Sequence, residues 1–201
     1  MISSPFVPWP AGETLVLASR SPRRAELLQT AGIPFEVRPA GDVESEHTPL
    51  HDHPQRYAEE LARLKAESIC EAMPGRLVLG ADTIVILAGE VLEKPRDEAE
   101  ARAMLARLAG RRHTVVSAIA LCGGKHCPWQ GHESTAVTFL PLAADAIARY
   151  VATGEPMDKA GAYGIQGFGA LMVSGVEGCY FNVMGLPLAL LGRALREVLS
   201  P

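Results

Sequence analysis

Residues 15–28 read Leu-Val-Leu-Ala-Ser-Arg-Ser-Pro-Arg-Arg-Ala-Glu-Leu-Leu, and this stretch decides how the rest of the chain can fold. The apolar run at its start is typical of a short buried strand. Ser21 followed by Pro22 is typical of the first positions of a helix. Arg23 and Arg24 then lie in a first helical turn, where backbone N–H groups and guanidinium groups both favour phosphate. The stretch therefore predicts a strand, a loop and a helix that bind a phosphate group.

The remaining chain alternates strand-like and helix-like segments. Apolar or alternating runs predict strands at residues 15–18, 34–37, 77–79, 84–87, 114–121, 134–140 and 170–176. Helical spacing and end signals predict helices at residues 22–31, 55–72, 97–108, 143–153 and 186–199. This order is typical of an α/β fold: a mixed, twisted sheet flanked by helices, which we expect to form two lobes around a central cleft. We expect a single domain over residues 14–201, preceded by an N-terminal extension at residues 1–13.

Asp82 adds a carboxylate to the phosphate-binding arginines of the candidate site. Residues 80–83 read Gly-Ala-Asp-Thr, and we place Asp82 at a turn between the strands at 77–79 and 84–87. A carboxylate beside bound phosphate must hold a divalent metal or move a proton, because otherwise it would repel the ligand. Asp82 with the two arginines therefore indicates a phosphate-ester site.

Two lysines, Lys94 and Lys65, are weaker candidates for binding phosphate. Lys94 is followed by Pro95, which fixes the chain and suits a lysine aimed inward at phosphate, although a surface position is the commoner alternative. Lys65 stands among apolar helical residues, where a lysine usually extends its ammonium group to solvent.

A glycine-rich stretch at residues 154–167 is a further candidate. Closely spaced glycines let backbone approach a ligand, and Gln166 can both donate to and accept from a base edge. A solvated loop is the alternative. The stretch matches neither GxxxxGK[ST] nor GxGxxG, which excludes P-loop and dinucleotide-binding motifs.

Composition narrows the class of protein. The 201 residues are 48% hydrophobic with a formal net charge of −4, which argues against binding to a nucleic acid polymer. The four cysteines form no CxxC pair, so we expect reduced thiols rather than a zinc or redox site. No apolar run reaches the roughly 18 to 20 residues of a membrane span, and the start lacks the features of a signal peptide. We therefore expect a cytoplasmic protein with no membrane partner.

Five motifs taken together resemble the Maf family of nucleoside triphosphate pyrophosphatases. They are Leu-Ala-Ser-Arg-Ser-Pro-Arg-Arg-Ala-Glu-Leu-Leu (17–28), Gly-Ala-Asp-Thr-Ile-Val (80–85), Lys-Pro (94–95), Asp-Lys-Ala-Gly-Ala-Tyr-Gly-Ile-Gln-Gly (158–167) and Val-Met-Gly-Leu-Pro (183–187). The resemblance implies hydrolysis between the α and β phosphates of a nucleoside triphosphate, with a divalent cation, Mg²⁺ or Mn²⁺, in a cytoplasmic homodimer. It begins at about residue 14.

The resemblance also implies residue roles. Asp82 matches the family's proton acceptor, which would activate the attacking water. The positions that would line the triphosphate site are Ser19, Arg24, Lys65 and Lys94. Cations there would neutralise charge on the phosphoryl oxygens during in-line attack.

Three positions that distinguish branches of the family are Arg23, Thr83 and Gln166. This combination resembles the branch that acts on dTTP and UTP, and modified pyrimidine nucleotides remain open as substrates. The branch that acts on 7-methyl-GTP carries different residues at these positions and is the alternative.

The metal ligands implied by the resemblance are Asp82 and an acidic residue of the loop after the second strand. We choose Glu44, with Glu46 in reserve. A cluster of His47, His51 and His53 is another possible metal site, but oxygen ligands suit Mg²⁺ and Mn²⁺ better than imidazole does.

The alternative to an enzyme is a regulator that binds nucleotides without essential catalysis. The resemblance allows this alternative because the family has been linked to septum formation in cell division. Such a protein would need the cations but not the general base. The presence of Asp82 therefore favours an enzyme.

Overall fold

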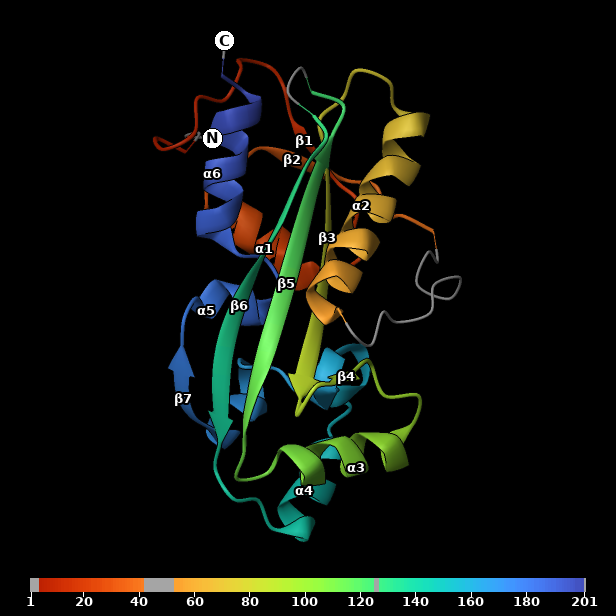
Figure 1. Cartoon of the computed structure of the whole chain (residues 1–201), viewed down its shortest axis with the longest axis vertical. Helices are drawn as coiled ribbons and strands as arrows, with labels where there is room; N and C mark the ends of the chain where they lie inside the picture. Colours follow the sequence, from red (N-terminus) through yellow and green to blue (C-terminus); the bar gives the residue numbers. More distant parts are fainter. Residues whose placement is uncertain (1–3, 42–52, 125–126, 201) are drawn as a thin grey trace.

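A seven-stranded sheet forms the centre of the computed structural model, which describes residues 4–41, 53–124 and 127–200 (Figure 1). The strand order is β2-β1-β3-β5-β6-β7, and β4 pairs with β3 off this path. The strands are β1 (Leu15–Leu17), β2 (Phe35–Val37), β3 (Val78–Leu87), β4 (Glu90–Leu92), β5 (Arg112–Cys122), β6 (Trp129–Phe139) and β7 (Val173–Glu177).

The sheet is mixed, as predicted. Strand β1 runs parallel to both β2 and β3, whereas the β3–β4, β3–β5, β5–β6 and β6–β7 pairs are antiparallel. The three long strands β3, β5 and β6 twist together along most of the molecule (Figure 1). The predicted α/β class with a twisted, mixed sheet is therefore confirmed, while its division into two lobes stays a prediction.

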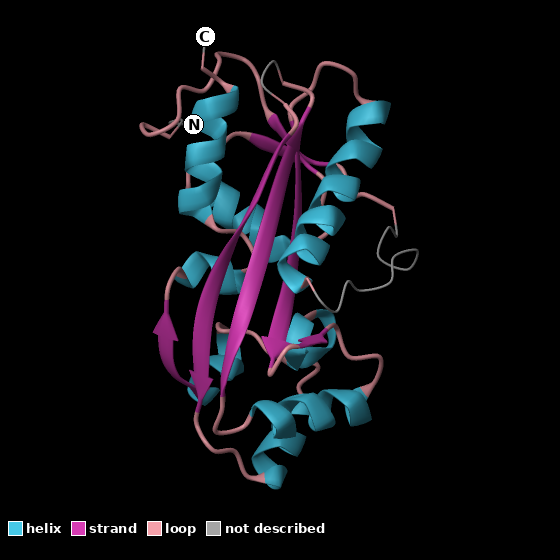
Figure 2. Ribbon diagram, in the orientation of Figure 1, coloured by secondary structure: helices cyan, strands magenta, loops and turns pink. Residues whose placement is uncertain are grey.

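Helices cover both faces of the sheet, and others lie at the end of the sheet away from the chain termini (Figure 2). They are α1 (Pro22–Thr30), α2 (Pro54–Ala72), α3 (Glu98–Leu108), α4 (Ala144–Val151), α5 (Tyr180–Met184) and α6 (Leu188–Val198). Three 3₁₀ turns, η1 (Glu155–Asp158), η2 (Ala160–Ala162) and η3 (Gly167–Met172), lie between α4 and β7. The five predicted helices are all present within a few residues of their predicted bounds.

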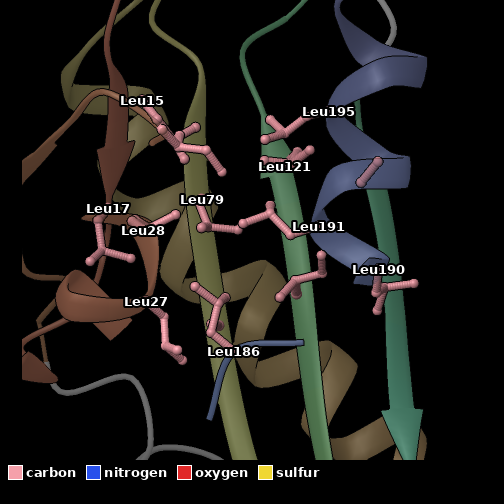
Figure 3. Close-up of a cluster of buried hydrophobic side chains, with 14 of the residues drawn as sticks. Leu15, Leu17, Leu27, Leu28, Leu79, Leu121, Leu186, Leu190, Leu191 and Leu195 are labelled. Atoms are coloured by element: carbon pink, nitrogen blue, oxygen red, sulfur yellow. The ribbon is translucent and has the colours of Figure 1, made fainter. Parts of the chain in front are cut away.

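Alternation along the strands divides the apolar side chains between two faces. On β3, Leu79 and Ala81 join the core beneath α1 and α6, whereas Val78 and Ile84 join the core beneath α2. Figure 3 shows the first of these cores, in which leucines from α1, α6 and the strands converge. A third core packs α3 and α4 against the other end of the sheet.

Local signals account for several helix ends. The carboxylate of Asp97 caps α3 by accepting from the backbone N–H of Glu100 at 2.8 Å, as predicted. Gly32 follows α1 with φ +65°, which suits the predicted stop. Ser21 occupies the predicted N-cap position of α1 with an extended backbone, but its side chain makes no capping hydrogen bond.

The predicted turn at Asp82 is wrong. Residues 78–87 form one continuous strand, because β5 pairs with this strand through the whole region and places Asp82 opposite Ala118. The sequence-based interpretation also missed β4, which follows a tight turn made by Ala88 and Gly89, both with positive φ. Strand pairing, which local sequence does not reveal, overrode the turn-like small residues before Asp82.

The four cysteines, Cys70, Cys122, Cys127 and Cys179, are free thiols in the structure. No helix in the described part of the chain is both long enough and apolar enough to span a bilayer.

Candidate active site

A gap in the strand pairing of β3 creates the site. On one side β3 pairs with β5 along nearly its whole length. On the other side β1 reaches only Leu79 and β4 begins only opposite Val85. Residues 80–84 therefore have no strand neighbour on that side within the described chain, and Asp82 lies at the centre of this open edge.

A pocket of about 570 Å³ opens at this edge. Eight residues singled out from the sequence line it: Ser19, Arg23, Arg24, Lys65, Asp82, Thr83, Lys94 and Gln166. They come from the β1–α1 connection, α2, β3, the segment after β4 and the glycine-rich segment. Elements far apart in the sequence thus bring all eight to one cavity.

The candidate metal ligands Glu44 and Glu46 lie outside the described residues, as do His47 and His51. His53 is described; it is exposed at the start of α2 and does not line the pocket. The proposed histidine cluster is therefore untested.

Asp82 and Lys65 form a buried ion pair at the bottom of the site. The Lys65 ammonium donates to Oδ1 of Asp82 at 2.6 Å, and the two residues are only 8% and 6% exposed. Lys65 thus points inward, not to solvent. The pair belongs to the face of the sheet that α2 covers, because Asp82 alternates in register with Val78 and Ile84.

Gly80 permits this ion pair. A Cβ atom on Gly80 would lie 2.0 Å from the carbonyl oxygen of Ala62 and 2.7 Å from the amide nitrogen of Ala66. Only glycine lets the backbone of α2 come this close to β3. The close approach sets Lys65, between those two alanines in α2, over the carboxylate two residues further along the strand.

Arg24 organises the opposite side of the pocket. Its guanidinium donates to Oγ of Ser19 at 3.0 Å, to the carbonyl of Gly185 at 2.9 Å and to Oγ1 of Thr83 at 3.2 Å. The Thr83 hydroxyl lies 2.8 Å from that of Ser117. These contacts hold a mostly buried cation in one orientation at the pocket wall, which suits binding of a polyanion.

A second ionic cluster lies at the pocket margin. Arg23 donates to Asp158 at 3.0 Å, and Lys159 donates to the same carboxylate at 2.6 Å. Burial opposes ionisation of Asp158, but Lys159 and Arg23 outweigh it and lower the pKa of the carboxyl. The cluster joins α1 to η1, so two distant segments share one pocket wall.

The glycine-rich segment is largely built into the fold, not a solvated loop. Ala162, Tyr163 and Ile165 are buried, and Gly161 has φ +67° at a place where a Cβ atom would lie 2.9 Å from the side chain of Val85. Gln166 is exposed and lines the pocket. The segment therefore supports an amide side chain at the pocket surface.

A divalent cation is compatible with the described residues. No group of three or more His, Cys, Asp or Glu residues within them could hold a metal ion. Oδ1 of Asp82 accepts from Lys65, and the described residues provide no donor to Oδ2. Mg²⁺ commonly takes one or two carboxylates and completes its shell with water and substrate phosphates, so one available carboxylate oxygen in a cation-lined pocket fits such an ion.

Three contributors to the site were missed. Gly185, with φ +107° at the end of α5, supplies the carbonyl that Arg24 contacts, and Ser117 of β5 supports Thr83. Glu155 also lines the pocket. Gly185 and Glu155 had a sequence signal, since Gly185 lies within the Val-Met-Gly-Leu-Pro motif and Glu155 within the glycine-rich stretch, whereas Ser117 had none.

Comparisons with known proteins match this sequence to one family. The family model for Maf-like proteins matches residues 14–198. The chain is 52% identical over 176 residues to a Symbiobacterium thermophilum protein named dTTP/UTP pyrophosphatase, covering 88% of this chain and 89% of that protein. It is 53% identical over 176 residues to a Moorella thermoacetica protein of the same name, covering 87% and 89%.

Among solved structures, that of the Staphylococcus aureus Ham1 protein is 16% identical, with a TM-score of 0.45 over 78% of each chain. The family match spans nearly the whole chain, and the relatives are about half identical to it over most of their length. The chain belongs to the Maf family.

Proposed function

We propose that this protein is a nucleoside triphosphate pyrophosphatase that hydrolyses dTTP and UTP, and modified pyrimidine nucleotides of the same shape, to the monophosphate and pyrophosphate. The observation that carries the proposal is Asp82, a buried carboxylate at an open sheet edge in a pocket lined by cations. The names of the Symbiobacterium and Moorella relatives support the same substrates.

The cations account for triphosphate binding. Arg24, Lys65 and Lys94 line the pocket together with the hydroxyl of Ser19, and hydrogen bonds to Ser19, Thr83 and Gly185 hold Arg24 in place. Pre-oriented cations stabilise charge on phosphoryl oxygens without reorganising during the reaction. We assign these four residues to the triphosphate.

Asp82 is the proposed general base. Within the described chain Oδ1 is fixed by Lys65, whereas Oδ2 carries two lone pairs, enough both to accept a proton from water and to contact a cation. The water oxygen would then bond to the α phosphorus as the bond to the bridging oxygen breaks and pyrophosphate leaves.

A divalent cation, Mg²⁺ or Mn²⁺, would be held by Asp82 and Glu44 and would neutralise charge on the phosphate oxygens. The protein's own residues would orient the substrate around it.

Base selectivity is assigned to Arg23, Thr83 and Gln166. Gln166 has the exposure needed to meet a base edge. Thr83 is occupied by hydrogen bonds to Arg24 and Ser117, so we assign it an indirect role through Arg24. We further propose a cytoplasmic homodimer, in which residues 14–201 form one domain.

The test compares pyrophosphate release from a panel of nucleoside triphosphates with Mg²⁺, with Mn²⁺ and with EDTA. We expect metal-dependent release from dTTP and UTP and little from purine nucleotides. Release mainly from 7-methyl-GTP would refute the substrate assignment. No release from any nucleotide would refute the enzyme itself and favour the regulator.

Asp82→Asn tests the general base. We expect turnover to fall by about 10²- to 10⁴-fold while nucleotide affinity stays within about threefold. Asp145→Asn, an exposed change on α4 outside the pocket, is the matched control and should behave as the parent. Circular dichroism of each variant confirms folding, and persistent hydrolysis by folded Asp82→Asn would show that another group is the base.

A further inference from the structure

The carboxylate of Glu155 lies against the loop that carries Gln166. Its Oε1 accepts from the Tyr150 hydroxyl at 2.9 Å and from the backbone N–H of Gly169 at 3.1 Å. Its Oε2 accepts from the backbone N–H of Phe168 at 3.1 Å. Both oxygens are thus used to fix the chain directly after Gln166.

The loop is also fixed on its other side. The Tyr150 hydroxyl accepts from the backbone N–H of Gly164 at 3.3 Å while it donates to Glu155. Burial raises the pKa of Tyr150, so its hydroxyl keeps the proton that it donates. Glu155 and Tyr150 together therefore hold the chain on both sides of Gln166.

The fit between Glu155 and this loop is tight. Gly167 has φ +65°, and a Cβ atom there would lie 2.6 Å from Oε2 of Glu155. A side chain at Gly167 would displace the carboxylate, so glycine and glutamate fit each other at this point. Such close contact between Gly167 and Glu155 restricts where Gln166 can lie in the pocket.

We propose that Glu155 is a positioning residue for base selectivity: by holding the backbone at residues 168 and 169, it sets the place of the Gln166 amide against the nucleobase. The proposal rests on the function proposed above. Binding energy that discriminates between bases depends on the placement of hydrogen-bonding groups, and a displaced amide loses that discrimination before it loses phosphate binding.

Glu155→Gln is the sharpest test because it keeps the size of the side chain. An amide offers one accepting oxygen and an NH₂ group, so it cannot accept from the Tyr150 hydroxyl and both backbone N–H groups with two oxygens. We expect the ratio of kcat/KM for dTTP to that for dGTP to fall by about tenfold. Tyr150→Phe, which keeps the carboxylate but removes the link to Gly164, should lower the ratio in the same direction.

A double-mutant cycle distinguishes positioning from general damage. If Glu155 acts through Gln166, adding Glu155→Gln to Gln166→Ala should change the already lowered ratio by less than about twofold. Leu195→Ala, a fully buried change in α6, is the control for loss of stability, and its selectivity should equal that of the parent. Additive effects in the cycle would overturn the proposal.

Amide hydrogen exchange gives a readout that does not depend on activity. We expect faster exchange at Phe168 and Gly169 in Glu155→Gln, because their N–H groups lose an acceptor. Unchanged exchange, or faster exchange with an unchanged selectivity ratio, would refute the positioning role. A parent that releases no pyrophosphate from dTTP or UTP would refute the proposed function instead, and exchange would still report whether Glu155 holds the loop.

Discussion

Gly80→Ala should separate α2 from β3 and thereby displace Lys65 from Asp82, the proposed general base. The added Cβ would lie 2.0 Å from the Ala62 carbonyl oxygen, a backbone atom that cannot rotate away. Real Cβ contacts are rarely below 3.0 Å, so the helix must move by about 1 Å. The Lys65–Asp82 hydrogen bond, 2.6 Å long, would stretch with it.

Two magnitudes follow from this clash. Overpacking of this kind costs about 2 kcal/mol in the free energy of unfolding. For a chain of 201 residues that corresponds to a Tm lower by roughly 4–8 °C. A displacement of about 1 Å at a catalytic group can cost about 10²-fold in turnover.

The assay pairs thermal unfolding with pyrophosphate release from dTTP, measured well below both melting temperatures. Gly175→Ala in β7 is the matched control, because a Cβ there meets nothing within 4 Å. It should leave both Tm and turnover close to those of the parent. A Gly80→Ala protein with the parent's Tm and turnover would show that the close approach of α2 to β3 has no role in holding the ion pair.

The remaining predictions concern stability. Burial lowers the pKa of His113 from 6.5 to about 4. Between these two pH values the unfolded chain binds a proton on His113 that the folded chain does not bind, so the free energy of unfolding should fall by up to about 3 kcal/mol as the pH drops from 6.5 to 4. Urea unfolding across this range should show the loss, and His113→Phe should remove it; an equal slope in both proteins would contradict the assignment. Asp97→Ala should lower the free energy of unfolding by about 1 kcal/mol through loss of the α3 cap, whereas Asp97→Asn should retain most of it. Equal stability of these two Asp97 variants would show that the cap contributes nothing.

The sequence predicted the class of fold, and it singled out residues that share one pocket, because both inferences depend on local signals or long motifs. Helical periodicity and capping residues located the helices, and Asp97 caps α3 as its position indicates. The motifs named eight residues that the fold brings to one pocket. Neither signal describes how strands pair, which is why the continuous strand through Asp82 was not predicted.

The helical spacing of the residues around Lys65 does not predict that its side chain is buried. The sequence around it favours a lysine that extends to solvent, but its partner lies 17 residues away on another element. Likewise, Glu155 interacts with backbone N–H groups at Phe168 and Gly169, and a backbone donor leaves no mark on residue type. Contacts to backbone are therefore the part of a site that sequence reasoning misses most readily.

Side chains alternate between the two faces of β3, which explains why the adjacent residues Asp82 and Thr83 have different partners in one pocket. Asp82 faces α2 and meets Lys65, while Thr83 faces the other side of the sheet and meets Arg24. In a fully paired strand the sheet itself would separate these two faces. Because β1 stops at Leu79 and β4 starts at Val85, the edge between them is open and both side chains reach the same cavity. The incomplete strand pairing therefore lets the proposed base, Asp82, and the proposed phosphate-binding residue, Arg24, face one substrate although they are anchored on opposite faces of the sheet.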